Sequence, residues 1–182
     1  MRMHRDCGDG LKRLIITGAN GAGKSRFAAE LALERPDTSV ISLDALKLLP
    51  DWQQRPRSET VAALAKALEA DTWILEGGQS LLPQAVGRAD ALVWLDPPEH
   101  VRAWQLAKRP WMFSGQTRPE LPSGNVDWPW QQYRYALRSH RNTSKFRTHI
   151  ADVFDKADGV QKWRCRTAHD RDDVVAAWVQ NR

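Results

Sequence analysis

The residues whose types and spacing best suit catalysis lie at 18–25, where the chain reads Gly-Ala-Asn-Gly-Ala-Gly-Lys-Ser. This stretch fits the pattern G-x-x-x-x-G-K-[ST] at every fixed position. Glycines let a backbone fold tightly with its amides directed inward, as around a phosphate. A helix beginning near Lys24 would add its positive end, the Lys24 ammonium can reach the β- and γ-phosphates, and the Ser25 hydroxyl can ligate Mg²⁺. The motif therefore predicts ATP and Mg²⁺ as ligands of Gly18, Ala19, Asn20, Gly21, Ala22, Gly23, Lys24 and Ser25.

The flanking pattern indicates which elements position this loop. Apolar residues at 14–16 predict a buried strand before it, and apolar residues at helical spacing follow it to 33. Further strands are predicted at 39–43, 72–75, 91–95 and 159–165, and helices at 58–70, 81–86, 99–108, 127–141, 144–154 and 170–179. Strands that alternate with helices indicate an α/β domain with a parallel sheet.

The charge of the chain is concentrated in one segment. Residues 101–150 hold nine Lys and Arg against two Asp and Glu. Such a segment can close over a polyphosphate or can bind nucleic acid, and the phosphate-binding motif favours the first use. Residues 109–130 lack periodicity but are rich in Pro, Gly and Trp, which predicts a mobile lid that packs when closed.

The arginines around the lid are candidates for contacts with the transferred phosphoryl group. Negative charge spreads over its equatorial oxygens, and cations must meet that charge there. We select Arg109, Arg118 and Arg138 as catalytic candidates, whereas we expect Arg102 to lie on the helix surface. A solvated basic face is the alternative explanation for any one of these residues.

The remaining composition favours a cytoplasmic protein. The chain has no apolar run of 18 residues, which argues against a membrane span, and residues 1–12 read as a loose extension with no secretory signal. The two cysteines, Cys7 and Cys165, are therefore expected to be reduced thiols.

These landmarks together resemble the P-loop kinases of the adenylate kinase and shikimate kinase type. The match is closest to the bacterial adenylate-kinase-like proteins labelled DNA topology modulation proteins. It rests on the residues that read Ser-Leu-Asp-Ala-Leu at 42–46, Arg-Pro-Arg at 55–57, Trp-Ile-Leu-Glu-Gly at 73–77, Val-Trp-Leu-Asp at 93–96 and Thr-Arg-Pro-Glu-Leu at 117–121. The resemblance implies a three-layer P-loop NTPase fold with five parallel strands in the order 2-3-1-4-5, helices on both faces and a basic lid. It makes 13–182 one domain, with an acceptor-binding lobe at 45–70 and a lid at 109–130.

The resemblance also implies roles for residues outside the phosphate-binding motif. Glu76 would hold Mg²⁺ with Ser25, or would be a strand-end acid that pairs with a helix. Asp44 would bind and polarise the acceptor hydroxyl, or would be a helix N-cap. Arg57 and Gly77 would contact the acceptor, and an arginine there would favour an anionic one.

The chain departs from the subfamily at one of these motifs. The subfamily usually has Asp-Gly-Asn where this chain has Glu76-Gly77-Gly78, and often an arginine shortly after, which residues 79–82 do not supply. Glutamate keeps the carboxylate but moves it about one methylene outward, which changes the expected metal geometry.

The predicted function is transfer of the γ-phosphoryl group of MgATP to a small acceptor such as a nucleoside, a nucleotide or another small molecule. One alternative is a nucleic-acid-binding ATPase or regulator that uses residues 101–150. The other is a nucleotide-binding module without transfer activity.

Overall fold

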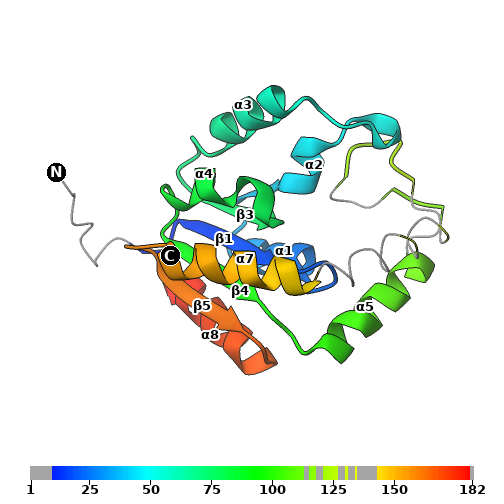
Figure 1. The fold of residues 1–182 in the computed structure, drawn as a ribbon. Helices are drawn as coiled ribbons and strands as arrows, with labels where there is room; N and C mark the ends of the chain where they lie inside the picture. The colour runs from blue at the N-terminus through cyan, green and yellow to red at the C-terminus, as the bar shows by residue number, and fades with distance from the viewer. Residues whose placement is uncertain are drawn as a thin grey trace.

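The protein folds around a single five-stranded sheet, shown in Figure 1 as a computed structural model. The structure describes residues 10–112, 115–117, 121–126, 130, 134 and 143–180. The strands are β1 (Arg13–Gly18), β2 (Ser39–Ser42), β3 (Trp73–Gly77), β4 (Ala91–Leu95) and β5 (Gln161–Cys165). All neighbouring strands are parallel and their order is β2-β3-β1-β4-β5. The predicted fold class and strand order are therefore confirmed.

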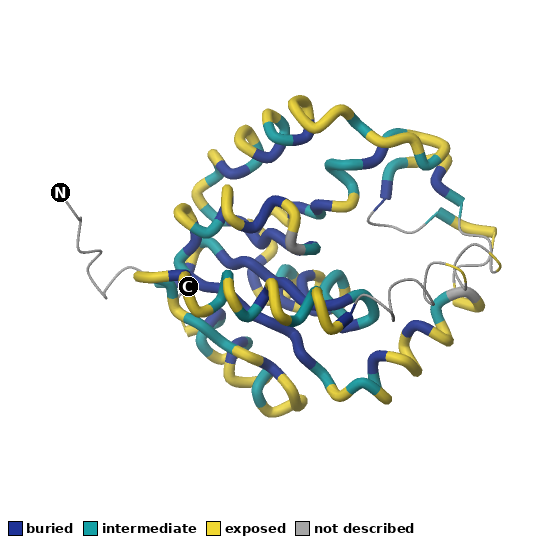
Figure 2. The backbone as a smooth tube through the Cα atoms, viewed as in Figure 1, coloured by how far each residue is buried: buried dark blue, intermediate teal, exposed yellow. Residues whose placement is uncertain are grey.

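Helices cover both faces of this sheet. They are α1 (Lys24–Glu34), α2 (Leu43–Lys47), α3 (Arg57–Ala67), α4 (Leu82–Val86), α5 (Glu99–Met112), α7 (Thr143–Lys156) and α8 (Ala168–Gln180), with 3₁₀ turns η1 (Pro50–Trp52) and η2 (Gln79–Leu81). The central strands β1, β3 and β4 read as apolar runs because both of their faces are buried, as Figure 2 shows.

Two apolar clusters, one on each face, hold the layers together. On one face the strands pack against α3, α4 and α7 through Leu64, Leu82 and Ile150. On the other face they pack against α1 and α8, where Phe27 and Trp178 are almost completely buried. This packing places the carboxyl ends of β1, β2 and β3 next to one another, beside the N-terminus of α1.

Several predicted boundaries shift in the structure. The second strand ends at Ser42 rather than Leu43, since α2 begins there with the Ser42 hydroxyl accepting a hydrogen bond from Ala45 N at 3.4 Å. Helix α3 begins at Arg57, one residue before the predicted start, and has no side-chain cap. Helix α5 continues to Met112, four residues beyond the predicted end.

Some predictions fall outside the described residues. These are the conformation of residues 1–9, the positions of Arg118 and Arg138, and most of the helix predicted at 127–141. In the part of the chain that is described, no helix has both the length and the apolar character needed to cross a membrane.

Candidate functional site

The phosphate-binding motif forms the turn between β1 and α1, as predicted. Gly21 and Gly23 have φ values of 82° and 89°, which L side chains rarely adopt, so glycine is required at both positions. Gly23 is the N-cap of α1, and the first helical hydrogen bond runs from Phe27 N to Gly23 O at 3.0 Å. The Lys24 ammonium lies back over the loop, with Nζ 3.3 Å from Ala19 O. The loop, the helix N-terminus and a lysine therefore come together in an anion-binding arrangement.

Glu76 lies directly beside this loop. β1 and β3 pair in parallel register, and the Ser25 hydroxyl at the start of α1 donates to Glu76 Oε2 at 3.3 Å. Glu76 is almost completely buried, and burial raises the pKa of its carboxyl group. Hydrogen bonding from Ser42 and the Lys24 charge act in the opposite direction. The longer glutamate side chain thus still reaches the Ser25 hydroxyl from its strand.

The Lys24 ammonium lies among charges of both signs. Burial lowers the pKa of Lys24, while the negative charges of Glu76 and Asp44 oppose that change. The positive charges of Arg109 and Lys47 lower the pKa of Lys24 further. The tertiary structure therefore brings Asp44 and Arg109, both selected from the sequence, into electrostatic contact with the phosphate-binding lysine.

Asp44 differs from its predicted local setting. The sequence pattern put it at the end of a strand, whereas it is the second residue of α2. The N-cap of that helix is Ser42, so the capping explanation for Asp44 is wrong. A carboxylate in the first turn of a helix is stabilised by the helix dipole, and it remains available to a ligand.

Arg57 and Gly77, the two predicted acceptor contacts, have different surroundings. Arg57 is exposed at the first residue of α3. Gly77 is the last residue of β3, and a Cβ atom there would lie 2.5 Å from Leu43 Cβ, so close packing of α2 already requires glycine. Roles for Arg57 and Gly77 toward an acceptor stay predictions.

Arg102 is not the surface residue that we expected. Its side chain is only 1% exposed, and Nη1 donates to Asn20 O of the phosphate-binding loop at 2.9 Å. The rest of the guanidinium is paired with Glu99, with Nε 2.9 Å from Oε2. The same helix packs closely on the loop, because a Cβ atom at Gly21 would lie 2.6 Å from Leu106 Cγ. Helix α5 therefore supports the loop, and Arg102 is the polar part of that contact.

Replacing Arg102 by alanine is expected to weaken MgADP binding about tenfold, since one hydrogen bond to a charged group contributes roughly 1.5–3 kcal/mol. The physical reason is that Asn20 O loses its donor and the loop loses part of its fixed shape. Titration calorimetry at a temperature where the variant is folded measures the change. Arg26→Ala, which removes an exposed arginine of α1, is the matched control. Equal affinities in the two variants would contradict this role.

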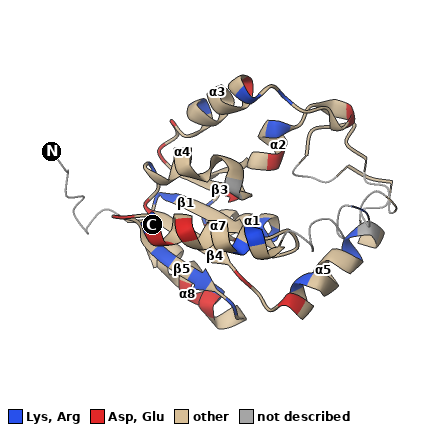
Figure 3. Ribbon diagram, in the orientation of Figure 1, with Lys and Arg blue, Asp and Glu red and all other residues tan. Residues whose placement is uncertain are grey.

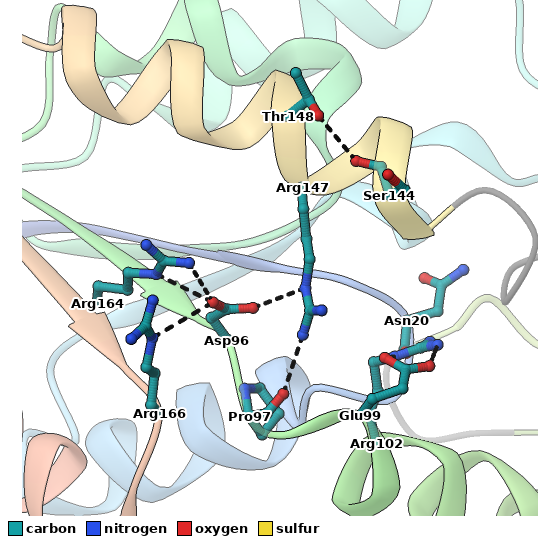
Figure 4. A network of polar contacts seen from close by, with 10 residues as sticks. All are labelled: Asn20, Asp96, Pro97, Glu99, Arg102, Ser144, Arg147, Thr148, Arg164 and Arg166. Atoms are coloured by element: carbon teal, nitrogen blue, oxygen red, sulfur yellow. Dashed lines mark hydrogen bonds and ion pairs between the residues drawn. The ribbon is translucent and has the colours of Figure 1, made fainter.

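Asp96, at the end of β4, is the centre of an arginine cluster (Figure 4). Its Oδ2 accepts from Arg164 Nη2 at 2.6 Å and lies 3.8 Å from Arg166 Nε, while Oδ1 lies 2.9 Å from Arg147 Nε. Arg147 also donates to Pro97 O at 3.3 Å. Asp96 thus joins β4 to β5 and α7, which is a structural role.

The cluster bears on the basic segment 101–150. Within the described part of that segment, Arg102 is paired with Glu99 and Arg147 with Asp96. In Figure 3 the Lys and Arg residues, in blue, are distributed over several elements. At least two of the nine cations therefore serve the fold, which weakens the nucleic-acid alternative.

A pocket of about 260 Å³ lies against the phosphate-binding loop. Ala22 of the loop forms one wall, and the other walls come from the β4–α5 and β5–α8 connections. Its further lining residues include Pro98, Val101, Gln105, Arg166, Thr167 and Arg171. The sequence did not point to this pocket, because its walls come from segments that are far apart along the chain and have no motif.

The side chains at the loop also fit a magnesium ion bound together with phosphate. Mg²⁺ prefers oxygen ligands and is held by one or two protein oxygens plus phosphate and water. Ser25 Oγ and Glu76 Oε2 provide two such oxygens in mutual contact. The described residues contain no group of three His, Cys, Asp or Glu that could hold a metal without phosphate.

The fold and this arrangement define a P-loop kinase fold. Among solved structures, shikimate kinase from Acinetobacter baumannii in complex with shikimate is similar, with a TM-score of 0.51 and 15% identity over 94% of this chain and 93% of that one. A gluconokinase from Sinorhizobium meliloti 1021 aligns with a TM-score of 0.47 and 16% identity over 94% and 91%. No protein-family model and no curated protein matches the chain. At such identities the likeness shows the fold, and the resemblance to the DNA topology modulation proteins stays a prediction.

Proposed function

We propose that this protein is a phosphotransferase that moves the γ-phosphoryl group of MgATP to a small acceptor. The observation that carries the proposal is the contact between Ser25 and Glu76 beside Lys24, because it joins a phosphate cradle to a metal-binding pair. The P-loop amides and Lys24 would hold the triphosphate, and Ser25 and Glu76 would hold Mg²⁺. When bound, Mg²⁺ would neutralise charge on the β- and γ-phosphates. The base and ribose would occupy the pocket beside Ala22.

Asp44 would act on the acceptor. The negative charge of Asp44 raises the pKa of both Lys24 and Glu76, which supports a position of Asp44 next to the γ-phosphate. In the transfer step, the acceptor oxygen forms a bond to the γ-phosphorus while the bond to the bridging oxygen breaks, and ADP leaves with that electron pair. The proton of the acceptor hydroxyl passes to an Asp44 carboxylate oxygen. Arg109 would balance charge on the transferred group.

The alternative of a nucleotide-binding module without transfer activity rests on Glu76-Gly77-Gly78 in place of Asp-Gly-Asn and on the arginine that residues 79–82 do not supply. The structure provides an observation against it, since Glu76 still contacts Ser25. The nucleic-acid alternative predicts DNA or RNA binding that weakens steeply with salt. A filter-binding assay at about 150 mM salt tests that alternative.

The proposal is tested by measuring ADP release from ATP and Mg²⁺ across a panel of nucleosides, nucleotides, sugars and small acids. We expect at least one class of acceptor to raise ADP release well above the acceptor-free rate. Lys24→Ala is the inactive control. A protein that binds MgADP but releases no additional ADP with any acceptor would support the module without transfer activity instead.

A further inference from the structure

Asn125 connects two segments that are far apart in the sequence. Its side chain is completely buried, and its Oδ1 accepts from Trp52 N at 2.6 Å. Its Nδ2 donates to Leu49 O at 3.1 Å and to Pro122 O at 3.0 Å. One amide side chain thus satisfies groups on the 49–52 turn, which contains η1, and on its own segment 121–126. Figure 1 shows these two segments side by side.

The 49–52 turn has a strained backbone. Asp51 and Trp52 both have φ 58°, a left-handed conformation that is uncommon for residues other than glycine. Such residues persist only where surrounding contacts impose the conformation, and they cluster at functional sites. The turn has the local hydrogen bonds Leu49 N to Gln53 O at 2.9 Å and Gln53 N to Pro50 O at 3.3 Å. The strained Trp52 N itself donates to Asn125, so a remote segment adds to these local bonds.

Other contacts strengthen the same connection. The Trp52 indole donates from Nε1 to Val126 O at 3.1 Å. Gly124 faces the turn closely enough that a Cβ atom on it would lie 3.5 Å from Pro50 Cβ. Val126 in turn forms an antiparallel bridge with Thr117. Residues 121–126 therefore belong structurally with the 49–52 turn.

The turn is connected directly to charged groups that act on the phosphate-binding loop. It directly follows α2, which contains Asp44 and Lys47. Arg55 N donates to Lys47 O at 2.8 Å, and Leu48 pairs with Gln54, so the chain on both sides of the turn forms a closed loop. Both Asp44 and Lys47 act electrostatically on Lys24. The half-buried Arg55 has its Nε atom buried without a hydrogen-bond partner.

We infer that Asn125 is a positioning residue for the acceptor side of the site: it holds the 49–52 turn in its strained form and thereby fixes the loop that presents Lys47 and Arg55. The part that concerns an acceptor rests on the proposed function. Two residues in the chain between β4 and β5 then support the binding of the two substrates separately. Arg102 supports the nucleotide loop, and Asn125 supports the acceptor side.

Hydrogen–deuterium exchange of Asn125→Ala tests the positioning directly, with Ser123→Ala, an exposed residue of the same segment, as the matched control. We expect the amides of 48–55 and 121–126 to lose protection together by about tenfold or more, while β1 and β3 stay protected. MgADP affinity should remain within about twofold of wild type, because the nucleotide loop is untouched. Retained protection at 48–55 would overturn the inference. A loss of MgADP affinity as large as the loss of protection would also overturn it.

Two further variants separate positioning from a general loss of stability. Asp51→Gly in the Asn125→Ala background should restore part of the protection at 48–55, since glycine adopts positive φ without external support. If Asn125→Ala does not fold, Trp52→Phe removes the indole N–H donor to Val126 O together with the five-membered ring and should loosen the same two segments. No recovery in the first case, or loosening of 121–126 alone in the second, counts against the inference.

The consequence for catalysis is a separate measurement. With an acceptor found in the panel, Asn125→Ala should raise the KM for that acceptor about tenfold and leave the KM for ATP unchanged. An equal rise in both KM values would overturn the acceptor-side assignment. If no acceptor is found, the proposed transfer activity fails, while the exchange experiment still decides whether Asn125 holds the turn.

Discussion

Replacing Lys24 by alanine is expected to abolish ADP formation while leaving the protein folded. Lys24 has the only cationic side chain in the loop 18–25. Its ammonium can stay in contact with the phosphoryl oxygens as negative charge moves over them in the transition state. We expect a loss of about a thousandfold in kcat/KM, which corresponds to roughly 4 kcal/mol. An enzyme-coupled ADP assay with the acceptor identified in the panel measures it.

The stability of the Lys24→Ala variant provides a second, independent result. Burial lowers the pKa of Lys24, which means that the folded protein disfavours the charged form. Removing the ammonium should therefore leave the melting temperature of the nucleotide-free protein unchanged or raise it. Lys66→Ala, an exposed lysine on α3, is the matched control. Wild-type turnover by Lys24→Ala would eliminate the catalytic interpretation of the loop.

Replacing Glu76 by glutamine is the second substitution with a large expected effect. Glutamine has nearly the same shape and can still accept the hydrogen bond from Ser25, but it lacks the charge that attracts Mg²⁺. We expect Mg²⁺-dependent turnover to fall about a hundredfold. The measurement is the initial rate as a function of Mg²⁺ concentration, with Glu69→Gln on the exposed surface as the control.

The pH dependence of Mg²⁺ binding has a definite sign at this position. Burial raises the pKa of Glu76, so its carboxylate takes up a proton at a higher pH than an ordinary glutamate does. Protons therefore compete with Mg²⁺, and the apparent Mg²⁺ affinity of wild type should fall as the pH is lowered toward that raised pKa. Glu76→Gln should lack this dependence. If its Mg²⁺ dependence matches wild type at every pH, Glu76 is not a metal ligand.

Glu76→Asp distinguishes the metal role from the pairing alternative. Aspartate keeps the charge and shortens the side chain, and it is the residue that the subfamily usually has. We expect it to retain most of the activity that Glu76→Gln loses. The comparison isolates charge from length, because the backbone position at the end of β3 is the same in both variants.

Short-range features of this protein were predictable from its sequence. The strand, loop and helix around 18–25 lie within one continuous stretch. The spacing of its glycines, lysine and serine predicts phosphate binding independently of the rest of the chain. The central strands β1, β3 and β4 were predictable because strands of a parallel sheet with both faces buried are apolar runs. The order of those strands required the family resemblance, and the structure confirms it.

Predictions were wrong where the same local sequence pattern is compatible with two different structures. A residue that follows an apolar strand can end it or can enter the next helix, and Asp44 does the second because Ser42 caps α2. An arginine on an amphipathic helix is usually exposed, yet Arg102 is buried because a backbone carbonyl 82 residues away accepts its hydrogen bond. The carbonyl that decides the position of Arg102 lies far outside the local pattern of its helix.

The sequence by itself determined the phosphate-binding loop and the α/β class, since those depend on local backbone conformation and on burial periodicity. Tertiary structure alone decided the contact of Ser25 with Glu76, the support of Asn20 by Arg102 and the connection of Asn125 to the 49–52 turn. Each of these joins positions at least 51 residues apart. The physical reason is that the parallel sheet brings successive strand ends to one edge, whereas nothing in the chain between them records which side chains will meet there.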